Sequence, residues 1–298
     1  MKIVIIGSKG FIGSYIHQYF QNQGNYVVGC DVVPDYVNIN YFQIDATNSD
    51  FYNLFNKFDF DICINCSGAA SVPDSLKNPI KDFYLNTVNV YKILDAIKTY
   101  RPLCKFINIS SAAVYGNPAV LPTKETDTLN PMSPYGIHKL MAENICKEFS
   151  EFYKISTCSI RVFSAYGEGL KKQIFWDLHK KFENPFNIDL FGTGNETRDF
   201  IHIADVANAI QAVADHAAFK GETINIANGN EISIKEAVEL FADIYQWKGN
   251  ISFSGNQRKG DPTRWKADIS VLETFGYLQR ISLKNGLTRY IKWIKGNN

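Results

Sequence analysis

The sequence has almost no excess of charge of either sign and no long apolar segment. Its 298 residues include 31 Lys and Arg against 30 Asp and Glu, a formal net charge of +1. This balance lacks the basic excess that is typical of proteins binding nucleic acid or anionic membranes. No stretch comes near the roughly 18 uninterrupted apolar residues of a membrane-spanning helix. We therefore expect no nucleic-acid or membrane partner, and an anionic ligand has to be bound by a few individual Arg or Lys residues.

The sequence also lacks a secretion signal and a metal-binding pattern. The apolar run near its start, residues 3–6, is too short for a signal peptide, so we expect a cytoplasmic location and reduced thiols at all six cysteines. Cys63 and Cys66 have C-x-x-C spacing, but on a predicted buried strand residues three apart point to opposite faces, which indicates packing rather than chelation. The histidines show no ligand spacing, so no metal is predicted.

The first half of the chain alternates between strand-like and helix-like segments. Apolar, β-branched segments predict strands at residues 2–6, 26–30, 41–44, 61–65, 104–109 and 157–162. Segments of helical length predict helices at residues 11–23, 51–58, 80–99 and 134–153. Such alternation builds parallel βαβ units, so we expect an α/β fold in which helices cover both faces of a parallel sheet.

Beyond about residue 163 the alternation loosens, and loops rich in Gly and Asn separate shorter helices such as residues 234–245. We expect one domain at residues 1–163, with short returns near residues 200–228, and a smaller α/β domain at residues 164–298. The smaller domain should lie over the carboxyl ends of the strands, where open α/β sheets bind their ligands.

A glycine-rich loop follows the first predicted strand and opens the first predicted helix. Gly7, Gly10 and Gly13 form a G-x-x-G-x-x-G pattern, in which glycines permit a tight turn and a close approach of the backbone to a pyrophosphate. Phe11 and Ile12 would begin the helix, whose N-terminal N–H groups and dipole attract anions. Because of its place between strand and helix, the loop predicts a dinucleotide-binding site.

Asp31, at the end of the second predicted strand, favours NAD over NADP. A carboxylate there accepts hydrogen bonds from the adenosine ribose and repels a 2′-phosphate. No Lys or Arg occurs between Lys9 and Lys57, so the usual basic partners of a 2′-phosphate are missing after this strand. Lys9 is the counter-argument, since a basic residue inside the glycine loop could reach a 2′-phosphate, and NADP is therefore not excluded.

Tyr135 and Lys139 form a Y-x-x-x-K pair near the start of the predicted helix at residues 134–153. Residues four apart share a helix face, and an ammonium favours the tyrosinate needed for proton transfer. The spacing alone is common, because Tyr15 and Tyr19 are equally spaced without any chemistry. A catalytic role for the pair is supported by its place after Ser110 and Ser111 at the carboxyl end of the fifth predicted strand. A serine hydroxyl there can hold a substrate oxygen.

In combination these motifs resemble the extended short-chain dehydrogenase/reductase family, in its nucleotide-sugar epimerase, dehydratase and reductase branch, and particularly enzymes similar to UDP-glucose 4-epimerase. The glycine triplet, S-S-A-A-V-Y-G at residues 110–116, Y-x-x-x-K and R-D-F-I-H at residues 198–202 occur in the family's order over nearly the whole chain. The resemblance implies a Rossmann-type doubly wound parallel sheet with a smaller C-terminal substrate domain. It also implies a homodimer, formed through the helices at residues 80–99 and 134–153.

Carried over by position, the resemblance implies a role for each matching residue. Tyr135 would be the general acid/base, Lys139 would bind the nicotinamide ribose, and Ser111 would hydrogen-bond the reacting sugar oxygen. The implied cofactor-binding residues are Gly7, Gly10, Phe11, Ile12, Gly13, Asp31, Asp45, Ala46, Asn86, Ser110, Tyr135 and Lys139. The implied substrate-binding residues are Ser111, Ser164, Arg198, Arg258 and Asp261, with the two arginines on the diphosphate of a nucleotide-diphosphate sugar. We interpret Arg264 and Lys266 as surface ion-pairing residues and His138 as a helix-surface histidine.

Two departures from the family's patterns narrow the reaction. Sugar-nucleotide 4,6-dehydratases carry an acid pair in T-D-E-V-Y-G, whereas this chain has Ser111, Ala112 and Ala113 before Val-Tyr-Gly, which argues against dehydration. Ser164 replaces the asparagine of the R-x-F-N motif found in many epimerases. The leading hypothesis is an NAD-dependent nucleotide-sugar 4-epimerase of carbohydrate biosynthesis. The alternatives are an NAD(P)H-dependent reductase of a nucleotide-linked 4-keto-6-deoxy sugar and a non-catalytic dinucleotide sensor or scaffold.

Overall fold

A seven-stranded parallel sheet forms the centre of the computed structural model, which describes residues 1–184, 186–256 and 260–296. The strand order is β11-β6-β5-β4-β1-β2-β3, so the winding direction reverses between β1 and β4, where doubly wound folds bind their ligands. The strands of the sheet are β1 (Lys2–Ile6), β2 (Tyr26–Asp31), β3 (Tyr41–Gln43), β4 (Ile62–Asn65), β5 (Lys105–Ser111), β6 (Thr157–Val162) and β11 (Lys220–Ile226). The expected α/β class with a doubly wound parallel sheet is confirmed.

Helices pack on both faces of this sheet because the side chains of each strand alternate between them. Ile3 and Ile5 of β1 belong to a core shared with α1 and α8, whereas Val4 and Ile6 belong to a core shared with α2, α5 and α6. All four side chains are at most 3% exposed. The helices of these two layers are α1 (Phe11–Asn22), α2 (Tyr52–Lys57), α5 (Asn89–Tyr100), α6 (Pro134–Tyr153) and α8 (Ile203–His216).

The predicted helix at residues 80–99 exists but is interrupted. It consists of α4 (Pro79–Phe83), one π-helical turn η1 (Tyr84–Val88) and α5. A π turn inserts an extra residue into the helical ladder and is frequent at functional sites. The strands predicted in the first half all form, and α6 has the predicted bounds of residues 134–153. The shorter α3 (Val72–Lys77), which was not predicted, begins after Ser71, whose hydroxyl accepts a hydrogen bond from the N–H of Asp74.

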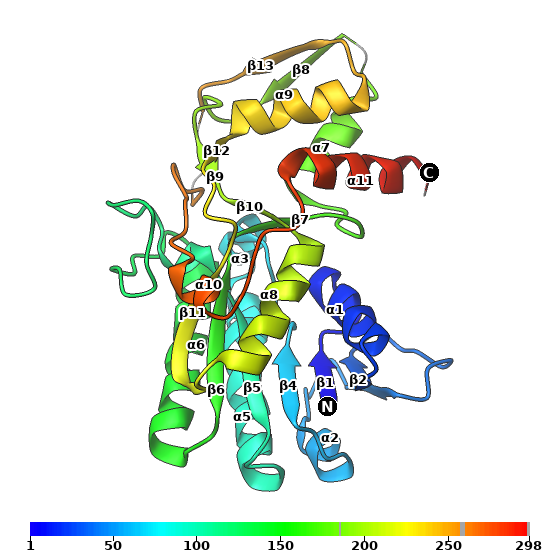
Figure 1. The fold of residues 1–298 in the computed structure, drawn as a ribbon, viewed down its shortest axis with the longest axis vertical. Helices are drawn as coiled ribbons and strands as arrows, with labels where there is room; N and C mark the ends of the chain where they lie inside the picture. Colours follow the sequence, from blue (N-terminus) through cyan, green and yellow to red (C-terminus); the bar gives the residue numbers. More distant parts are fainter. Residues whose placement is uncertain (185, 257–259, 297–298) are drawn as a thin grey trace.

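A second group of elements gathers at the end of the sheet toward which the strands run, as Figure 1 shows. Its helices α7, α9 and α11 and strands β8 and β13 share a separate apolar core. The strands pair in twos outside the main sheet, β10 with β7, β12 with β9 and β13 with β8. The bounds are β7 (Ser164–Tyr166), α7 (Gln173–Lys181), β8 (Asn187–Leu190), β9 (Thr197–Arg198), β10 (Phe200–His202), β12 (Ile232–Ser233), α9 (Ile234–Tyr245), β13 (Asn250–Phe253), α10 (Ser270–Thr274) and α11 (Leu283–Gly296).

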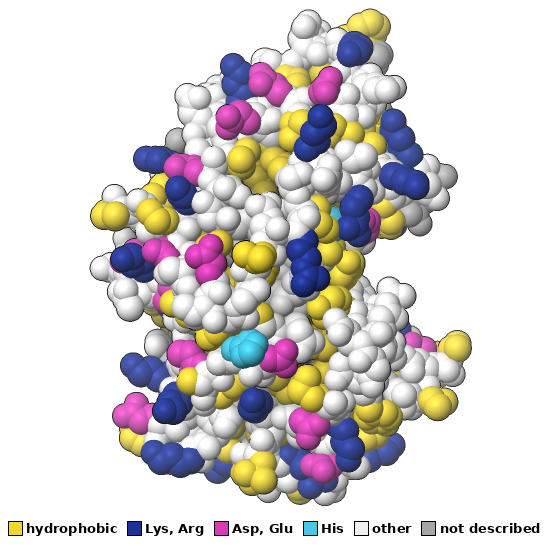
Figure 2. All heavy atoms as spheres, viewed as in Figure 1, with side chains coloured by type: hydrophobic (Ala, Val, Ile, Leu, Met, Phe, Trp, Pro, Cys, Tyr) yellow, Lys and Arg dark blue, Asp and Glu magenta, His cyan; other side chains and the backbone are white. Residues whose placement is uncertain are grey.

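The surface carries charges of both signs without a dominant field. Figure 2 shows basic and acidic side chains interspersed over the face in view, as expected for a net charge of +1. Among the described residues, no helix combines the length and the apolar character required to cross a bilayer.

Candidate active site

A cavity of about 650 Å³ lies at the carboxyl ends of the strands, between the sheet and the second group of elements. This volume falls in the range of small-molecule and cofactor sites, about 300–1,000 Å³. Both halves of the chain contribute to its wall. The predicted residues that line it are Gly10, Phe11, Ile12, Ser110, Ser111, Tyr135, Lys139, Ser164, Arg198 and Asp261. The structure thus brings together the tyrosine, the lysine and the serine with the glycine loop at one end and Arg198 at the other.

The start of α6 holds Tyr135 against Ser111. Ser133 caps this helix by accepting a hydrogen bond from the N–H of Gly136 at 3.2 Å, and Pro134 occupies the first turn. A β-carbon on Gly136 would lie 2.6 Å from the carbonyl oxygen of Ala113, so only glycine lets α6 approach the 3₁₀ turn η2 (Ala112–Val114) so closely. Because η2 directly follows Ser111, this contact sets the distance between the serine and the phenol.

Lys139 lies one helical turn beyond Tyr135 and faces the same cavity. Its Nζ donates to the carbonyl oxygen of Ile109 at 2.8 Å and lies 6.0 Å from the centre of the Tyr135 ring. Burial lowers the pKa of Lys139 to about 8, and the carboxylate of Asp82 is the first of several charges that oppose this shift. Burial raises the pKa of Tyr135 to about 12, while a hydrogen bond with Ser111 acts in the opposite direction. Proton transfer by Tyr135 near neutral pH therefore requires additional positive charge next to it.

Two glycines of the glycine loop have different surroundings: Gly13 packs tightly against the turn after β1, whereas Gly10 borders the cavity. A β-carbon on Gly13 would lie 2.0 Å from the carbonyl oxygen of Gly7, so α1 can contact the turn after β1 only without a side chain there. Gly10 precedes α1 and lines the cavity. The first N–H groups of a helix have no partner within it, so those of Phe11 and Ile12 are available to an anion.

Replacing Gly13 with alanine is expected to abolish retention of a bound dinucleotide, because the methyl group would displace α1 from the turn. The measurement is the dinucleotide released per chain on denaturation, together with the thermal unfolding temperature. Gly296→Ala is the matched control, since a β-carbon there has no heavy atom within 4 Å. Equal dinucleotide content in the Gly13→Ala and unsubstituted proteins would contradict this account of the loop.

Asp31 and Lys9 interact through the backbone, and the ammonium of Lys9 is already paired. Asp31 accepts a hydrogen bond from the N–H of Lys9 at 2.9 Å, which ties the end of β2 to the glycine loop. The Nζ of Lys9 contacts Asp35 at 2.5 Å and lies 5.1 Å from the centre of the Tyr41 ring. Since Asp35 neutralises this ammonium, Lys9 is a weaker attractor for a 2′-phosphate than the sequence alone suggested.

The remaining predicted cofactor residues do not line the cavity. Gly7, Gly13, Asp31, Asp45, Ala46 and Asn86 are absent from its wall among the described residues. Asp45 follows β3 and stands beside Asp31, because the N–H of Ile44 donates to the carbonyl oxygen of Asp31 at 2.9 Å. Asn86 is 1% exposed, and both polar atoms of its side chain have no partner among the described residues. A β-carbon on Gly68 would lie 2.4 Å from its Oδ1 and 3.5 Å from the Nζ of Lys139.

Arg198 is presented to the cavity by β9 and supported by Trp265. Its guanidinium carbon lies 5.5 Å from the centre of the Trp265 ring, and its Nη1 donates to the carbonyl oxygen of Thr197 at 2.8 Å. Burial lowers the pKa of Arg198, and Asp261 and Glu196 oppose this shift. An arginine side chain stays charged in proteins, and its planar guanidinium can bind an anion through two parallel hydrogen bonds. Arg258 lies outside the described residues.

The predictions for other residues have mixed outcomes. Arg264 forms an exposed ion pair with Glu231 at 2.8 Å, as expected. The interpretation of His138 as a surface histidine is wrong: its side chain is 12% exposed, and its Nδ1 lies 2.6 Å from Asp82. Cys63 is a buried free thiol on β4, in line with a packing role.

Sequence reasoning missed several parts of the cavity wall. One is the segment at residues 66–73, which directly follows β4; its place at the carboxyl end of a central strand was the available signal. Another is Trp265, to which no spacing in the sequence pointed, because it comes from a loop of the second half of the chain. Lys172, whose Nζ reaches the carbonyl oxygen of Ala70 at 3.4 Å, also lines the cavity; it belongs to the loop at residues 169–173, which the sequence indicates as a candidate for nucleotide binding.

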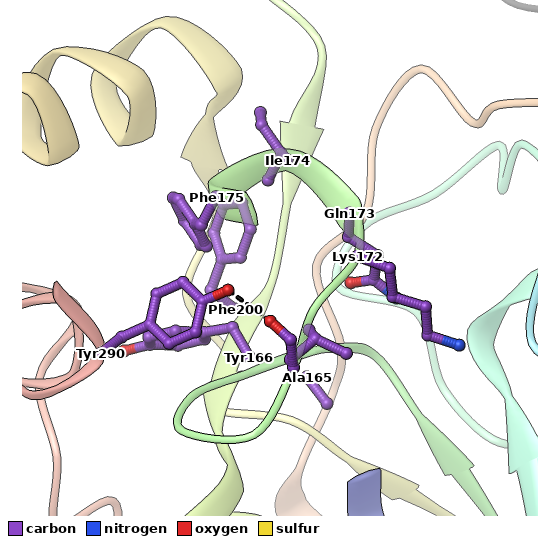
Figure 3. A pocket seen from close by; sticks show the side chains of 9 residues that line it. Ala165, Tyr166, Lys172, Gln173, Ile174, Phe175, Phe200 and Tyr290 are labelled. Atoms are coloured by element: carbon purple, nitrogen blue, oxygen red, sulfur yellow. Dashed lines mark hydrogen bonds between the residues drawn. The ribbon is translucent and has the colours of Figure 1, made fainter. Parts of the chain in front are cut away.

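A small hollow adjoins the large cavity but is not a second site. Figure 3 shows the rings of Tyr166, Phe175, Phe200 and Tyr290 around it, with the side chain of Lys172 directed away from the rings. Its volume is about 10 Å³, close to the minimum for one water molecule. The hollow is therefore a packing gap behind the loop that leads from β7 to α7.

Comparison with known proteins supports a common origin with sugar-nucleotide epimerases. The sequence model of the NAD dependent epimerase/dehydratase family matches residues 3–227. A Methanocaldococcus jannaschii protein, provisionally named UDP-glucose 4-epimerase, is 30% identical over 99% of both chains. UDP-glucuronate 4-epimerase of Thermodesulfobacterium geofontis is 25% identical over 99% of this chain and 96% of its own. The crystal structure of UDP-glucuronic acid 4-epimerase from Bacillus cereus, with UDP-glucuronic acid and NAD bound, has a TM-score of 0.90 at 27% identity and covers 100% of both chains.

Proposed function

Because this chain belongs to the NAD-dependent epimerase/dehydratase family, we propose that it inverts the configuration at C4 of a nucleotide-linked hexose, with NAD as its resident cofactor. It is an NAD-dependent nucleotide-sugar 4-epimerase, similar over its full length to UDP-sugar 4-epimerases. The observation that carries the proposal is the arrangement of Ser111, Tyr135 and Lys139 on one wall of a cavity that the glycine loop and Arg198 enclose.

The described residues fit a dinucleotide. The turn that Gly13 permits and the free N–H groups at the start of α1 suit the pyrophosphate, and Asp31 suits the adenosine ribose. The unpartnered amide of Asn86 lies beside Lys139, where a nicotinamide ribose and ring would supply polar groups. We assign the adenine edge to Asp45 and Ala46. When bound, the cofactor supplies oxidation at C4 and reduction on the opposite face of the sugar.

Tyr135 moves the proton at the C4 oxygen. In the tyrosinate form it accepts the hydroxyl proton as C4 is oxidised and returns it when C4 is reduced, so the enzyme ends each cycle unchanged. Ser111 donates a hydrogen bond to the same oxygen and holds it in reach of the phenol. Lys139 keeps its ammonium within the same buried wall, where the positive charge lowers the free energy of the tyrosinate.

The second half of the chain binds the nucleotide-diphosphate part of the substrate. Arg198 supplies a half-buried guanidinium for the diphosphate, and the ring of Trp265 packs against it. Asp261 contacts the nucleotide ribose, and Ser164 contacts the sugar from β7. Residues 1–163, together with the returning β10, α8 and β11, form the cofactor domain, and most of residues 164–298 form the substrate domain. Arg258 is the second diphosphate ligand in this proposal.

Replacing Arg198 with alanine is expected to raise the KM for the nucleotide sugar by about 10- to 100-fold with a smaller change in kcat, because a charge-assisted hydrogen bond contributes about 1.5–3 kcal/mol to binding. Steady-state kinetics with one nucleotide sugar measures both constants. Arg264→Ala is the matched control, since this arginine is exposed and paired with Glu231. A KM for Arg198→Ala equal to that of the control would remove Arg198 from the diphosphate site.

The other reactions are less well supported. Relatives that match the whole chain include UDP-sugar 4-epimerases, so reduction of a 4-keto-6-deoxy sugar is not favoured. Dehydration lacks its acid pair, because Ala112 and Ala113 stand at those positions and are held in η2. A non-catalytic sensor or scaffold would not require Tyr135, Lys139 and Ser111 together on the cavity wall.

The test begins by denaturing freshly purified protein and identifying the released dinucleotide. Near-stoichiometric NAD+ is expected, since an epimerase regenerates its cofactor in every cycle. UDP-glucose, UDP-glucuronic acid and UDP-N-acetylglucosamine are then supplied without added cofactor, and inversion at C4 is followed by proton NMR. An empty protein that reduces a nucleotide-linked 4-keto sugar with NADH or NADPH would replace the epimerase proposal by the reductase.

The helices α4–α5 and α6 also suit a homodimer. Exposed apolar side chains accumulate on them: Ile80 is 66% exposed, Tyr84 54%, Tyr91 43% and Met141 41%. We infer that a second copy covers this surface and that the enzyme acts in the cytoplasm. Sedimentation equilibrium at micromolar protein concentration measures the mass directly, and a monomer would refute the dimer.

A further inference from the structure

A histidine–carboxylate pair lies behind the proposed catalytic residues and outside the cavity wall. His138 stands between Tyr135 and Lys139 in the chain, and its Nδ1 lies 2.6 Å from the Oδ2 of Asp82 on α4. The backbone of the same histidine is anchored as well, because the hydroxyl of Thr87 donates to its carbonyl oxygen at 3.0 Å. The ring of Phe83 packs against the imidazole with a centroid separation of 5.4 Å.

Asp82 is a buried carboxylate with few hydrogen-bonding partners. It is 2% exposed, and its second oxygen, Oδ1, has no hydrogen-bond partner among the described residues. An ionised carboxylate away from water is costly unless it is hydrogen-bonded and close to positive charge. His138 provides the hydrogen bond. The nearby positive charge is that of Lys139, the next residue along α6.

The charge of Asp82 acts on both members of the proposed catalytic pair. Burial lowers the pKa of Lys139, and the carboxylates of Asp82 and Glu143 oppose this shift, Asp82 more strongly than Glu143. Burial raises the pKa of Tyr135, and Asp82 raises it further, against the hydrogen bond from Ser111. Glu143 is the other carboxylate near Lys139, but Arg161 neutralises it at 2.8 Å. Of the two carboxylates that act on Lys139 among the described residues, Asp82 is the one without an arginine partner.

We propose that Asp82, held in place by His138, is the counter-ion that sets the charge state of the Tyr135–Lys139 pair. Asp82 and His138 are then positioning residues of the epimerisation. The inference rests on the proposed function for its link to turnover. The coupling itself rests on geometry: buried Asp82 on α4 contacts His138 at 2.6 Å, and His138 lies between Tyr135 and Lys139 in the first two turns of α6. An anion stabilises the protonated forms of both neighbours: the ammonium, which is required, and the phenol, which has to ionise. Asp82 therefore fixes the pH window in which tyrosinate and ammonium coexist.

The decisive variant is Asp82→Asn, which keeps the shape of the side chain and removes its charge. Because both neighbours then lose a proton more readily, the acid and alkaline limbs of the profile of kcat against pH should both move to lower pH, by about half a unit to one unit. A residue with a purely structural role would lower kcat at every pH and leave the limbs in place. Unmoved limbs in Asp82→Asn would overturn the proposal.

Two variants of His138 provide the matched comparison. Asparagine retains a donor close to the position of Nδ1, so His138→Asn should keep the profile of the unsubstituted protein. Alanine removes the donor, and a buried carboxylate without a hydrogen bond takes up a proton at higher pH. His138→Ala should therefore resemble Asp82→Asn. Identical profiles for the two histidine variants would overturn the role of the hydrogen bond, even if Asp82→Asn failed to fold.

A second readout needs no turnover. The ultraviolet absorbance of tyrosinate, titrated in each protein and in the same protein carrying Tyr135→Phe, isolates the ionisation of Tyr135 by difference. The midpoint is expected at lower pH in Asp82→Asn than in the unsubstituted protein. A shifted midpoint in a protein that inverts no nucleotide sugar would refute the epimerase proposal and leave the coupling intact, whereas an unshifted midpoint would refute the coupling.

Discussion

Replacing Tyr135 with phenylalanine is expected to lower kcat for C4 inversion by about 100- to 10,000-fold, the range that general acid–base catalysis contributes. The substitution removes one oxygen atom and leaves the ring, which is 9% exposed and held by the start of α6. The cavity wall should therefore keep its shape. NAD content and nucleotide-sugar binding, measured by release on denaturation and by calorimetry, should change little.

The same substitution at Tyr153 is the control. Tyr153 ends α6, is 42% exposed and packs on Phe149 at 4.9 Å between ring centroids, far along the helix from the cavity wall. Tyr153→Phe should retain full turnover. Turnover in Tyr135→Phe that equals the control would eliminate the phenol as the proton-transfer group and would transfer the question to Ser111.

The strands of the sheet could be predicted because burial on both faces leaves a local signature. Residues 3–6 of β1 form a continuous apolar run because Ile3 and Val4 enter cores on opposite sides of the sheet. The π turn at Tyr84–Val88 could not be predicted, because the extra residue depends on how α4 and α5 pack on α6, and side-chain periodicity does not record that packing.

The site was predictable where one motif carries its own geometry. Tyr135 and Lys139 share a face because they are four residues apart on a helix, and Ser111 ends a strand at the expected edge of the sheet. Contacts between segments far apart in the chain have no local sequence signal and could not be predicted. They are the contacts of Lys9 with Asp35, Arg198 with Trp265 and His138 with Asp82. Each of these changes the charge or the orientation of a predicted residue. The sequence therefore indicated which side chains belong to the candidate site, whereas their charge and orientation depend on contacts that only the folded chain makes.

Replacing Arg161 with methionine is expected to lower the free energy of unfolding by about 3–5 kcal/mol, the cost of leaving a buried charge unpaired. Arg161 of β6 and Glu143 of α6 are 3% and 4% exposed and are joined by contacts of 3.0 and 2.8 Å. Two further groups complete the network, since Arg161 donates to the hydroxyl of Tyr115 at 2.8 Å and Ser110 donates to Glu143 at 2.5 Å. Urea unfolding of each variant measures the change.

The expected loss is specific to a buried pair. Arg264→Met breaks the pair with Glu231, in which Arg264 is 61% exposed, and should leave the free energy of unfolding almost unchanged, because solvent screens an exposed ion pair. Replacing both Arg161 and Glu143 with methionine removes the unpaired charge, so the double variant should recover part of the stability that Arg161→Met loses. Equal losses in Arg161→Met and Arg264→Met would contradict this reasoning. Since Glu143 lies two turns beyond Tyr135 on α6, a confirmed loss would also identify the ion pair that ties the proposed catalytic helix to the sheet.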